Sequence, residues 1–230
     1  MILKIFTGVM MTFFVLAAFA GQGGGSSTVG DGGFAVVCFA GLKNKQVRAE
    51  LLDLFEEKVL TQERKKVTLG NGANPEPLLE VALQRLQKKI SLTEYEFSTV
   101  SWAAFSFLRD AQDPWMSGAR IGANDFVRAQ DILLDKRVYS QANSRGCRIA
   151  PVAIRPAQVG TNRINYERLC RARGLSFEDC FFIDNSIYKD LSASHRACLA
   201  LHESLRYLPE SLRPRSERQL RKIVAEICFE

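Results

Sequence analysis

Phe34-Ala-Val-Val-Cys-Phe39 is a short, continuous apolar run, and a run of this length is typical of a buried β-strand. The polar segment that follows, Gly41-Leu-Lys-Asn-Lys45, can turn the chain. From Val47 to Asp53 the pattern first alternates, which predicts a second strand paired with the first. The apolar residues from position 47 onward also recur at helical spacing, so a helix could begin there instead. We expect a hairpin followed by a helix from about Leu54 to Lys66.

The clearest helix begins at Asn74-Pro75. Asn74 can cap the helix, and a proline at the first helical position loses no hydrogen bond. A further helix is predicted from Thr93 to Leu108. We expect its aromatic side chains, Tyr95 and Trp102 among them, to be largely buried as core residues.

Two helices are predicted to close the chain. Ser192 can cap the first, which extends to about Leu208, and Ser216-Glu-Arg-Gln219 fits a capping box for the second. A proline within the strand that follows Cys147 suits a sheet edge or a bulge. The elements expected before these helices are strands at Phe126–Leu134, Cys147–Arg155 and Cys180–Asp184, and a short helix at Tyr166–Arg173.

Together these segments predict an α+β fold, with a small antiparallel sheet packed with about five helices. Residues 34–230 are expected to form a single domain, because no polar or Pro/Gly-rich linker divides them. The composition, 47% hydrophobic and 24% charged, is that of a globular protein. A chain of 230 residues can bury a sizeable core without a metal or a disulfide.

The N-terminus has the features of a cleaved signal peptide over residues 1–20. Lys4 is the charged start, the run from Ile5 to Ala18 is apolar, and Ala18-Phe-Ala20 fits an A-x-A cleavage site. A membrane anchor is the alternative, but the run is shorter than the roughly 20 residues that a spanning helix needs. Residues 21–33, GQGGGSSTVGDGG, have the composition of a flexible spacer. We therefore expect an exported protein, periplasmic or secreted, whose mature chain has no transmembrane span.

The formal net charge is +6, and the most basic stretch lies near the C-terminus. Outside the cytoplasm such a stretch suits an anionic envelope component, a lipid headgroup or a cell-wall polymer, and no nucleic acid is expected there. A solvated helix face is the alternative interpretation. The residues expected to contact the anionic component are Arg213, Arg215, Arg218, Arg221 and Lys222.

The chain has two histidines, and both belong to the helix predicted to begin at Ser192. His195, Cys198 and His202 share one helical face, and all three side chains can bind zinc. The two histidines are about 10.5 Å apart along the helix axis, which is too far for one ion without further ligands.

His202-Glu203 matches the start of an H-E-x-x-H motif, in which two histidines hold zinc and the glutamate activates water. Arg206 occupies the position of the second histidine, and a guanidinium cannot bind a metal. A metal-dependent hydrolase would therefore need ligands from elsewhere in the chain, such as Glu210, Glu217 or Asp184. The structural alternative is a buried His202 hydrogen-bonded to a carbonyl or carboxylate, with Glu203 paired to Arg206 or Tyr207.

The chain has six cysteines and no C-x-x-C motif, so zinc-ribbon and thioredoxin-like sites are not indicated. An even number of cysteines in an exported protein suggests disulfides. Six cysteines allow 15 pairings, and spacing alone does not choose among them. They are Cys38, Cys147, Cys170, Cys180, Cys198 and Cys228.

Several segments follow the signal peptide in an ordered set that runs through most of the mature chain. They include Gly30-Asp-Gly-Gly-Phe-Ala-Val-Val-Cys38, Glu50-Leu-Leu-Asp-Leu-Phe-Glu56, Arg145-Gly-Cys-Arg-Ile-Ala-Pro-Val-Ala153 and Leu201-His-Glu-Ser-Leu-Arg-Tyr207. In this order they resemble a group of uncharacterised exported proteins of Gram-negative bacteria. That group has a GDGG-x4-C start and an LHE-x3-Y helix near the C-terminus, and the resemblance implies no activity.

The resemblance implies a disulfide between Cys38 and Cys147. The other four cysteines are additions to the group's pattern and stay open, with Cys170–Cys180 and Cys198–Cys228 as candidate pairs. The residues that match the group's helix pattern are His202, Glu203, Tyr207 and Arg221.

Two functional hypotheses follow from the sequence. The first is an interaction or structural domain of the cell envelope that needs no cofactor. The alternative is a metal-dependent hydrolase, with zinc as its metal, His202 and Glu203 as catalytic residues, and His202 and His195 as ligands.

Overall fold

The structure is a computed structural model that describes residues 33–40, 45–70, 72–112, 134–154, 167–168, 170–172 and 181–230. The predicted signal peptide, residues 21–32 of the predicted spacer and nearly all of the predicted strand Phe126–Leu134 lie outside these ranges. The strands are β1 (Phe34–Ala40), β2 (Lys45–Leu51), β3 (Cys147–Pro151), β4 (Ala153–Ile154) and β5 (Phe182–Ile183). The helices are α1 (Leu52–Thr61), α2 (Pro75–Ile90), α3 (Glu94–Gln112), α5 (Lys136–Ser144), α7 (Asn185–Tyr188), α8 (Ala193–Ser204), the 3₁₀ helix η3 (Leu205–Tyr207) and α9 (Glu217–Phe229).

The predicted hairpin is present, and it forms two strands of an antiparallel sheet with the order β2-β1-β3. Val36 on the central strand lies opposite Glu50 on β2 and Ile149 on β3. Pro151 lies on β3, an edge of this sheet, which is where proline is tolerated. Strands β4 and β5 pair as a separate two-stranded ladder. The fold is therefore α+β, as predicted.

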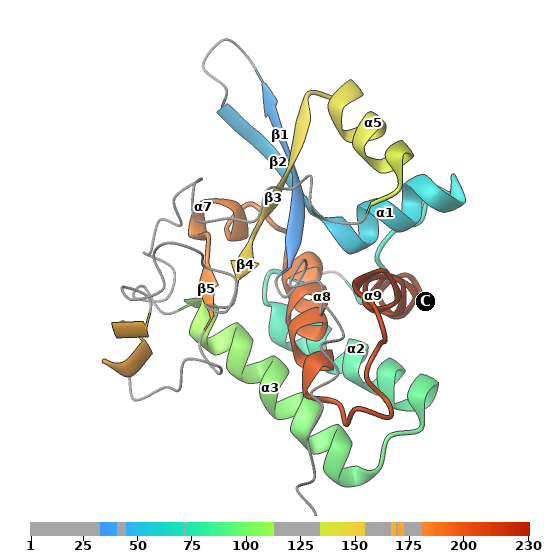
Figure 1. Cartoon of the computed structure of the whole chain (residues 1–230), viewed down its shortest axis with the longest axis vertical. Helices are drawn as coiled ribbons and strands as arrows, with labels where there is room; N and C mark the ends of the chain where they lie inside the picture. Colours follow the sequence, from blue (N-terminus) through green and yellow to red (C-terminus); the bar gives the residue numbers. More distant parts are fainter. Residues whose placement is uncertain are drawn as a thin grey trace, which may run out of the picture.

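The main sheet is covered on both faces, because successive residues of β1 point to opposite sides. Ala35 and Val37 belong to the larger core, which α2, α3, α8 and α9 complete. Phe34 and Val36 belong to a smaller core that α1 and α5 close. In Figure 1, α1 and α5 lie beside the sheet, and α2, α3, α8 and α9 gather below it. Two covered faces account for the uninterrupted apolar sequence of β1.

Helix α8 runs through the centre of the larger core (Figure 1). Every residue from Ala197 to Leu205 is buried, so this part of the helix has no solvent face. It packs against α2, α3, α9 and β2. A helix enclosed on all sides needs a partner for each polar side chain that it carries.

Three of the predicted helix starts are confirmed by their caps. The side chain of Asn74 accepts a hydrogen bond from the Glu76 N–H at 3.1 Å, and Pro75 follows at the first helical position. Ser192 caps α8 and Ser216 caps α9 in the same way. The helix expected over Leu54–Lys66 begins earlier, at Leu52, and ends at Thr61, where Gln62 takes a left-handed φ of 58°. Helix α5 was not predicted.

The expectation that Tyr95 and Trp102 are buried is wrong. Their exposed fractions are 81% and 66%. They are seven residues apart, on the side of α3 opposite the face that carries Val100, Ala104 and the other buried residues. An aromatic side chain within an amphipathic helix can therefore belong to its solvent face.

Two disulfides join distant segments. Cys38 and Cys147 lie directly opposite each other on β1 and β3, and their S–S bond is the pairing that the resemblance implied. Cys198 is bonded to Cys228, which fastens α8 to α9. Cys170 is also disulfide-bonded, and because Cys180 lies outside the described residues the Cys170–Cys180 pairing stays a prediction.

No helix in the described ranges is both long enough and apolar enough to cross a lipid bilayer.

Candidate functional site

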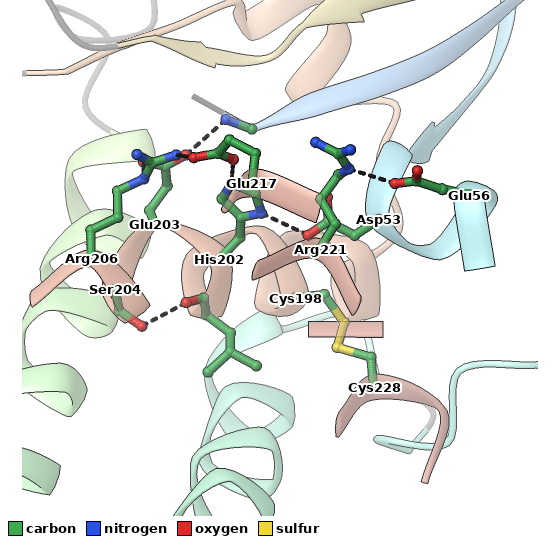
Figure 2. A network of polar contacts seen from close by, with 12 residues as sticks. Asp53, Glu56, Cys198, His202, Glu203, Ser204, Arg206, Glu217, Arg221 and Cys228 are labelled. Carbon is green, nitrogen blue, oxygen red and sulfur yellow. Dashed lines mark hydrogen bonds and ion pairs between the residues drawn. A yellow bond between two sulfur atoms is a disulfide. The ribbon is translucent and has the colours of Figure 1, made fainter. Parts of the chain in front are cut away.

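His202 and Glu203, the two residues singled out as catalytic, lie in a buried group of charged side chains. We call this group the ionic cluster; Figure 2 shows it from close by. Four segments contribute to it, α1, α8, η3 and α9, so it lies where three helices and a 3₁₀ turn meet. Its members are Asp53, Glu56, His202, Glu203, Arg206, Glu217 and Arg221.

The closest contact to His202 is with Asp53. The distance from His202 Nδ1 to Asp53 Oδ2 is 2.7 Å, and each residue is 1% exposed. Burial by itself lowers the pKa of His202, but the Asp53 carboxylate, helped by Glu203 and Glu217, outweighs it and raises the pKa above its usual value. This shift favours the protonated imidazole, whose Nδ1 donates a charge-assisted hydrogen bond to Asp53.

The other ring nitrogen of His202 faces α9. Its Nε2 lies 3.9 Å from Oε2 of Glu217, and the second oxygen of Glu217 accepts a hydrogen bond from the Arg206 guanidinium at 3.1 Å. Burial raises the pKa of Glu217, while the nearby His202 and Arg206 charges oppose this. Positive and negative side chains thus alternate from Arg206 through Glu217 and His202 to Asp53.

Glu203 holds the start of β1. Its Oε1 accepts a hydrogen bond from the backbone N–H of Gly33 at 2.8 Å, and its Oε2 lies 3.9 Å from Nε of Arg206. The carbonyl of Gly33 accepts from the backbone N–H groups of Val152 and Ala153. Gly33 was expected to end the flexible spacer; instead it is buried and belongs to the folded domain.

Gly33 also fits closely against α8. A Cβ at this position would lie 1.9 Å from Cδ1 of Leu199. Only glycine leaves room for the backbone to approach α8 closely enough to reach Glu203.

Arg221 and Glu56 form the part of the cluster that joins α9 to α1. Arg221 Nε donates to Glu56 Oε2 at 2.5 Å, and Arg221 is 4% exposed. The prediction that Arg221 contacts an anionic partner is therefore corrected, because its guanidinium is buried and already paired with a carboxylate.

The helix face predicted to bind a metal, with His195, Cys198 and His202, does not form a metal site. Cys198 is bonded to Cys228, so its sulfur is not a thiolate, and Nδ1 of His202 is bound to Asp53. His195 has other charged neighbours, Glu50 and Lys58, and burial lowers its pKa to about 4. Within the described ranges no group of three or more His, Cys, Asp or Glu side chains has the arrangement of a metal site.

The cluster is closed to a substrate at His202. A catalytic base must come within hydrogen-bond reach of the proton that it removes. His202 is 1% and Glu203 3% exposed, and each already has a protein partner. The arrangement is suited to fastening α1, α8, α9 and β1 together, which matches the structural alternative for His202.

Two hollows flank α1. The smaller, about 250 Å³, lies between α1 and α9, and Arg218 and Lys222 are at its rim. The larger, about 750 Å³, lies between α1 and α5. We call the larger one the α1–α5 groove.

The sequence did not predict Asp53, Glu56 and Gly33 as members of the site, and Glu217 was expected there only as a possible metal ligand. The two acids on α1 carry a visible signal, since Asp53 and Glu56 stand among apolar residues in Leu51-Leu-Asp-Leu-Phe-Glu56. Acidic side chains within a buried helical stripe require partners. The signal shows that a partner exists without showing which one.

Comparison of the chain with protein-family models, with curated proteins and with solved structures found no match. The site is therefore interpreted from its own geometry.

Proposed function

We propose that the protein is an exported, disulfide-bonded domain of the cell envelope that binds an anionic envelope component through exposed basic side chains. The residues are Arg213, Arg215, Arg218 and Lys222, which precede α9 and occupy its first turns; we call them the basic segment. On this proposal the ionic cluster has a structural role.

The exposure of the basic segment is the observation that carries the proposal. All four side chains are exposed, and in the described part of the chain Arg213, Arg215 and Arg218 form no ion pair. Arg213 donates to the carbonyl of Leu208, which fixes its position but leaves its charge uncompensated.

The disulfides support the export part of the proposal. Disulfides persist in oxidising compartments and are rare where thiols are kept reduced. In the described ranges every cysteine is oxidised.

Binding to lipid vesicles tests the proposal. The chain from residue 21 onward should sediment with vesicles that contain phosphatidylglycerol and not with phosphatidylcholine vesicles, and about 0.5 M salt should abolish the binding. Replacing Arg213, Arg215, Arg218 and Lys222 by Gln should weaken binding by at least about tenfold, because each basic residue near an anionic surface contributes about 1 kcal/mol. Isolated bacterial envelopes, used in the same assay, test cell-wall polymers as the alternative source of anionic groups.

A matched control has the same change of net charge at exposed positions elsewhere. It replaces Lys88, Arg109, Arg168 and Lys189 by Gln. Binding that is salt-insensitive, or that is lost equally in both variants, would contradict the proposal.

Export has its own measurement. The protein recovered from the periplasm or the medium should begin at Gly21, and its intact mass should show six oxidised cysteines. Recovery of a Met1 form with free thiols from the cytoplasm would rule out export. The hydrolase alternative gains no support from the closed geometry at His202 and Glu203.

A further inference from the structure

We propose that the α1–α5 groove binds a saccharide unit that carries a phosphate or carboxylate group. The inference rests on the proposed function, because it assigns part of the anionic component to a defined site. The groove volume of about 750 Å³ lies within the range of about 300–1,000 Å³ found for small-molecule sites.

The acidic side chains of the groove are already compensated. Glu50 lies 2.5 Å from Nζ of Lys58 and 3.3 Å from the guanidinium of Arg48. Glu63 lies 3.0 Å from Nζ of Lys65. Neither acid therefore compensates the remaining basic side chains of the groove.

Arg145 is held in place without being neutralised. Its guanidinium lies over the ring of Phe55 at 5.6 Å from the centroid. With the side-chain amide of Gln141 oriented so that its oxygen faces Arg145, this oxygen accepts hydrogen bonds from Nε and Nη2 of Arg145 at 3.1 and 2.9 Å. A guanidinium has five N–H donors, so others remain to bind an anion.

Arg64 supplies a second positive charge at the rim. It is exposed, and in the described ranges neither Arg64 nor Arg145 forms an ion pair. Arg137 also lines the groove, but its guanidinium is paired with Asp135 at 2.9 Å. The groove is thus lined by two uncompensated cations, Arg64 and Arg145, and by two compensated ones, Lys58 and Arg137.

The rest of the lining favours a sugar over a bare anion. Ser140, Gln141 and Ser144 present one polar face of α5, and serine hydroxyls both donate and accept hydrogen bonds, as sugar hydroxyls do. Val59 of α1, which is half-buried, supplies an apolar surface opposite this face, and the buried Phe55 lies beneath the Arg145 guanidinium. A saccharide ring has apolar C–H faces and polar edges, so it can use both sides of the groove, whereas an inorganic phosphate ion can use only the cations.

The groove lies close to the basic segment. The α1–α5 groove and the hollow lined by Arg218 and Lys222 both lie against α1, and Arg218 contributes weakly to the lowered pKa of Asp135, the N-cap residue of α5. An anionic polymer could therefore contact the basic segment and place one of its units in the groove.

Amide chemical shifts in ¹⁵N-labelled mature protein test the inference with four probes: glucose 1-phosphate, glucuronate, glucose and inorganic phosphate. A charged sugar should give saturable shifts around Ser144 and Arg145, with glucose and inorganic phosphate at least about tenfold weaker. Binding of the phosphorylated sugar alone, of glucuronate alone or of both identifies the anionic group, and each supports the inference.

Variants separate the groove from its surroundings. Arg64→Gln with Arg145→Gln should weaken binding of the charged sugar by about tenfold or more. Arg137→Gln is the matched control within the same groove, and it should change binding by less than about twofold because Asp135 already compensates Arg137.

Three results would overturn the inference: no binding of either charged sugar, equal binding of glucose or inorganic phosphate, or an unchanged affinity in the double variant. Vesicle binding that depends on the basic segment, without sugar binding, would overturn this inference alone. Sugar binding in the groove, without any binding to vesicles or envelopes, would overturn the proposed function of the basic segment alone.

Discussion

Asp53 and His202 are 149 residues apart in the sequence and form the most deeply buried charge pair of the ionic cluster. A buried pair of this kind adds little net stability compared with an apolar pair of the same shape. Removing one member of the pair is strongly destabilising, because the other member is left as an uncompensated buried charge. The pair therefore acts as a constraint on how α1 and α8 can be arranged.

We predict that His202→Gln destabilises the fold by about 3–5 kcal/mol, because the Asp53 carboxylate loses its cation. Adding Asp53→Asn should cost less than the sum of the two single changes, since the double variant buries no charge at this position. Urea unfolding at pH 6 measures all three variants. His195→Gln on the same helix is the control, and strictly additive costs of the Asp53 and His202 changes would contradict the pairing.

Gly33 gives a second prediction at this scale. Gly33→Ala should destabilise the fold by about 1–3 kcal/mol, because the new methyl group would overlap Leu199. Adding Leu199→Ala should recover part of that loss relative to the sum of the single changes. Gly72→Ala is the matched control, since a Cβ there would meet nothing closer than 3.7 Å, and equal effects at both glycines would refute the packing argument.

At the scale of elements, α8 and α9 are fastened by packing, by ion pairs of the cluster and by the disulfide between Cys198 and Cys228. The basic segment occupies the start of α9, so the position of α9 also fixes the proposed binding surface.

Replacing Cys198 and Cys228 together by Ala should lower the stability by about 3–4 kcal/mol, the chain-entropy value for a loop of this length. Amide hydrogen exchange should become faster in α9 before it does in β1, because the change releases only the α8–α9 connection. If hydrogen exchange became equally faster in α9 and β1, the disulfide would stabilise the whole fold rather than the α8–α9 contact, and the prediction would be wrong.

The elements with local signals were predictable, and those defined by tertiary contacts were not. Asn74, Ser192 and Ser216 mark helix starts because capping depends on residues within a few positions. Helix α5 was missed because its only buried residues are Val138 and Ala142, too few to give an apolar stripe.

The site was predictable to a similar extent. His202 and Glu203 stand out in the sequence, but nothing local shows that Asp53 lies opposite His202 or that Gly33 lies opposite Glu203. Those contacts depend on how β1 and α1 pack on α8. The pattern of α3 likewise does not show which side faces the core, so Tyr95 and Trp102 were misplaced.

At the scale of the whole molecule, the ionic cluster links stability to pH. The folded-state pKa of His202 is raised above its unfolded value of 6.5, so the folded state binds the proton more tightly. The contribution of His202 to the free energy of unfolding is therefore complete below pH 6.5, and it is lost as the pH rises through the folded-state pKa. The pKa of His195 is lowered to about 4, so its contribution is complete above pH 6.5 and is lost as the pH falls toward 4.

We predict that the urea midpoint decreases from about pH 6.5 upward and that His202→Gln flattens this alkaline limb. His195→Gln should instead reduce the decrease on the acid side and leave the alkaline limb in place. Unfolding curves between pH 4 and 9 measure both effects. An alkaline limb that persists unchanged in His202→Gln would assign the titration to another group.

The position of the first bridge has a consequence for biosynthesis. Cys38 leaves the ribosome 109 residues before its partner Cys147. At about 5–20 residues per second, that thiol waits roughly 5–20 seconds while the rest of the loop is made. No other cysteine lies between the two, so the first cysteine that can pair with Cys38 as the chain is made is its native partner, Cys147. Formation of this bridge should therefore need little help from a disulfide isomerase if it is complete before Cys170 and the later cysteines are made.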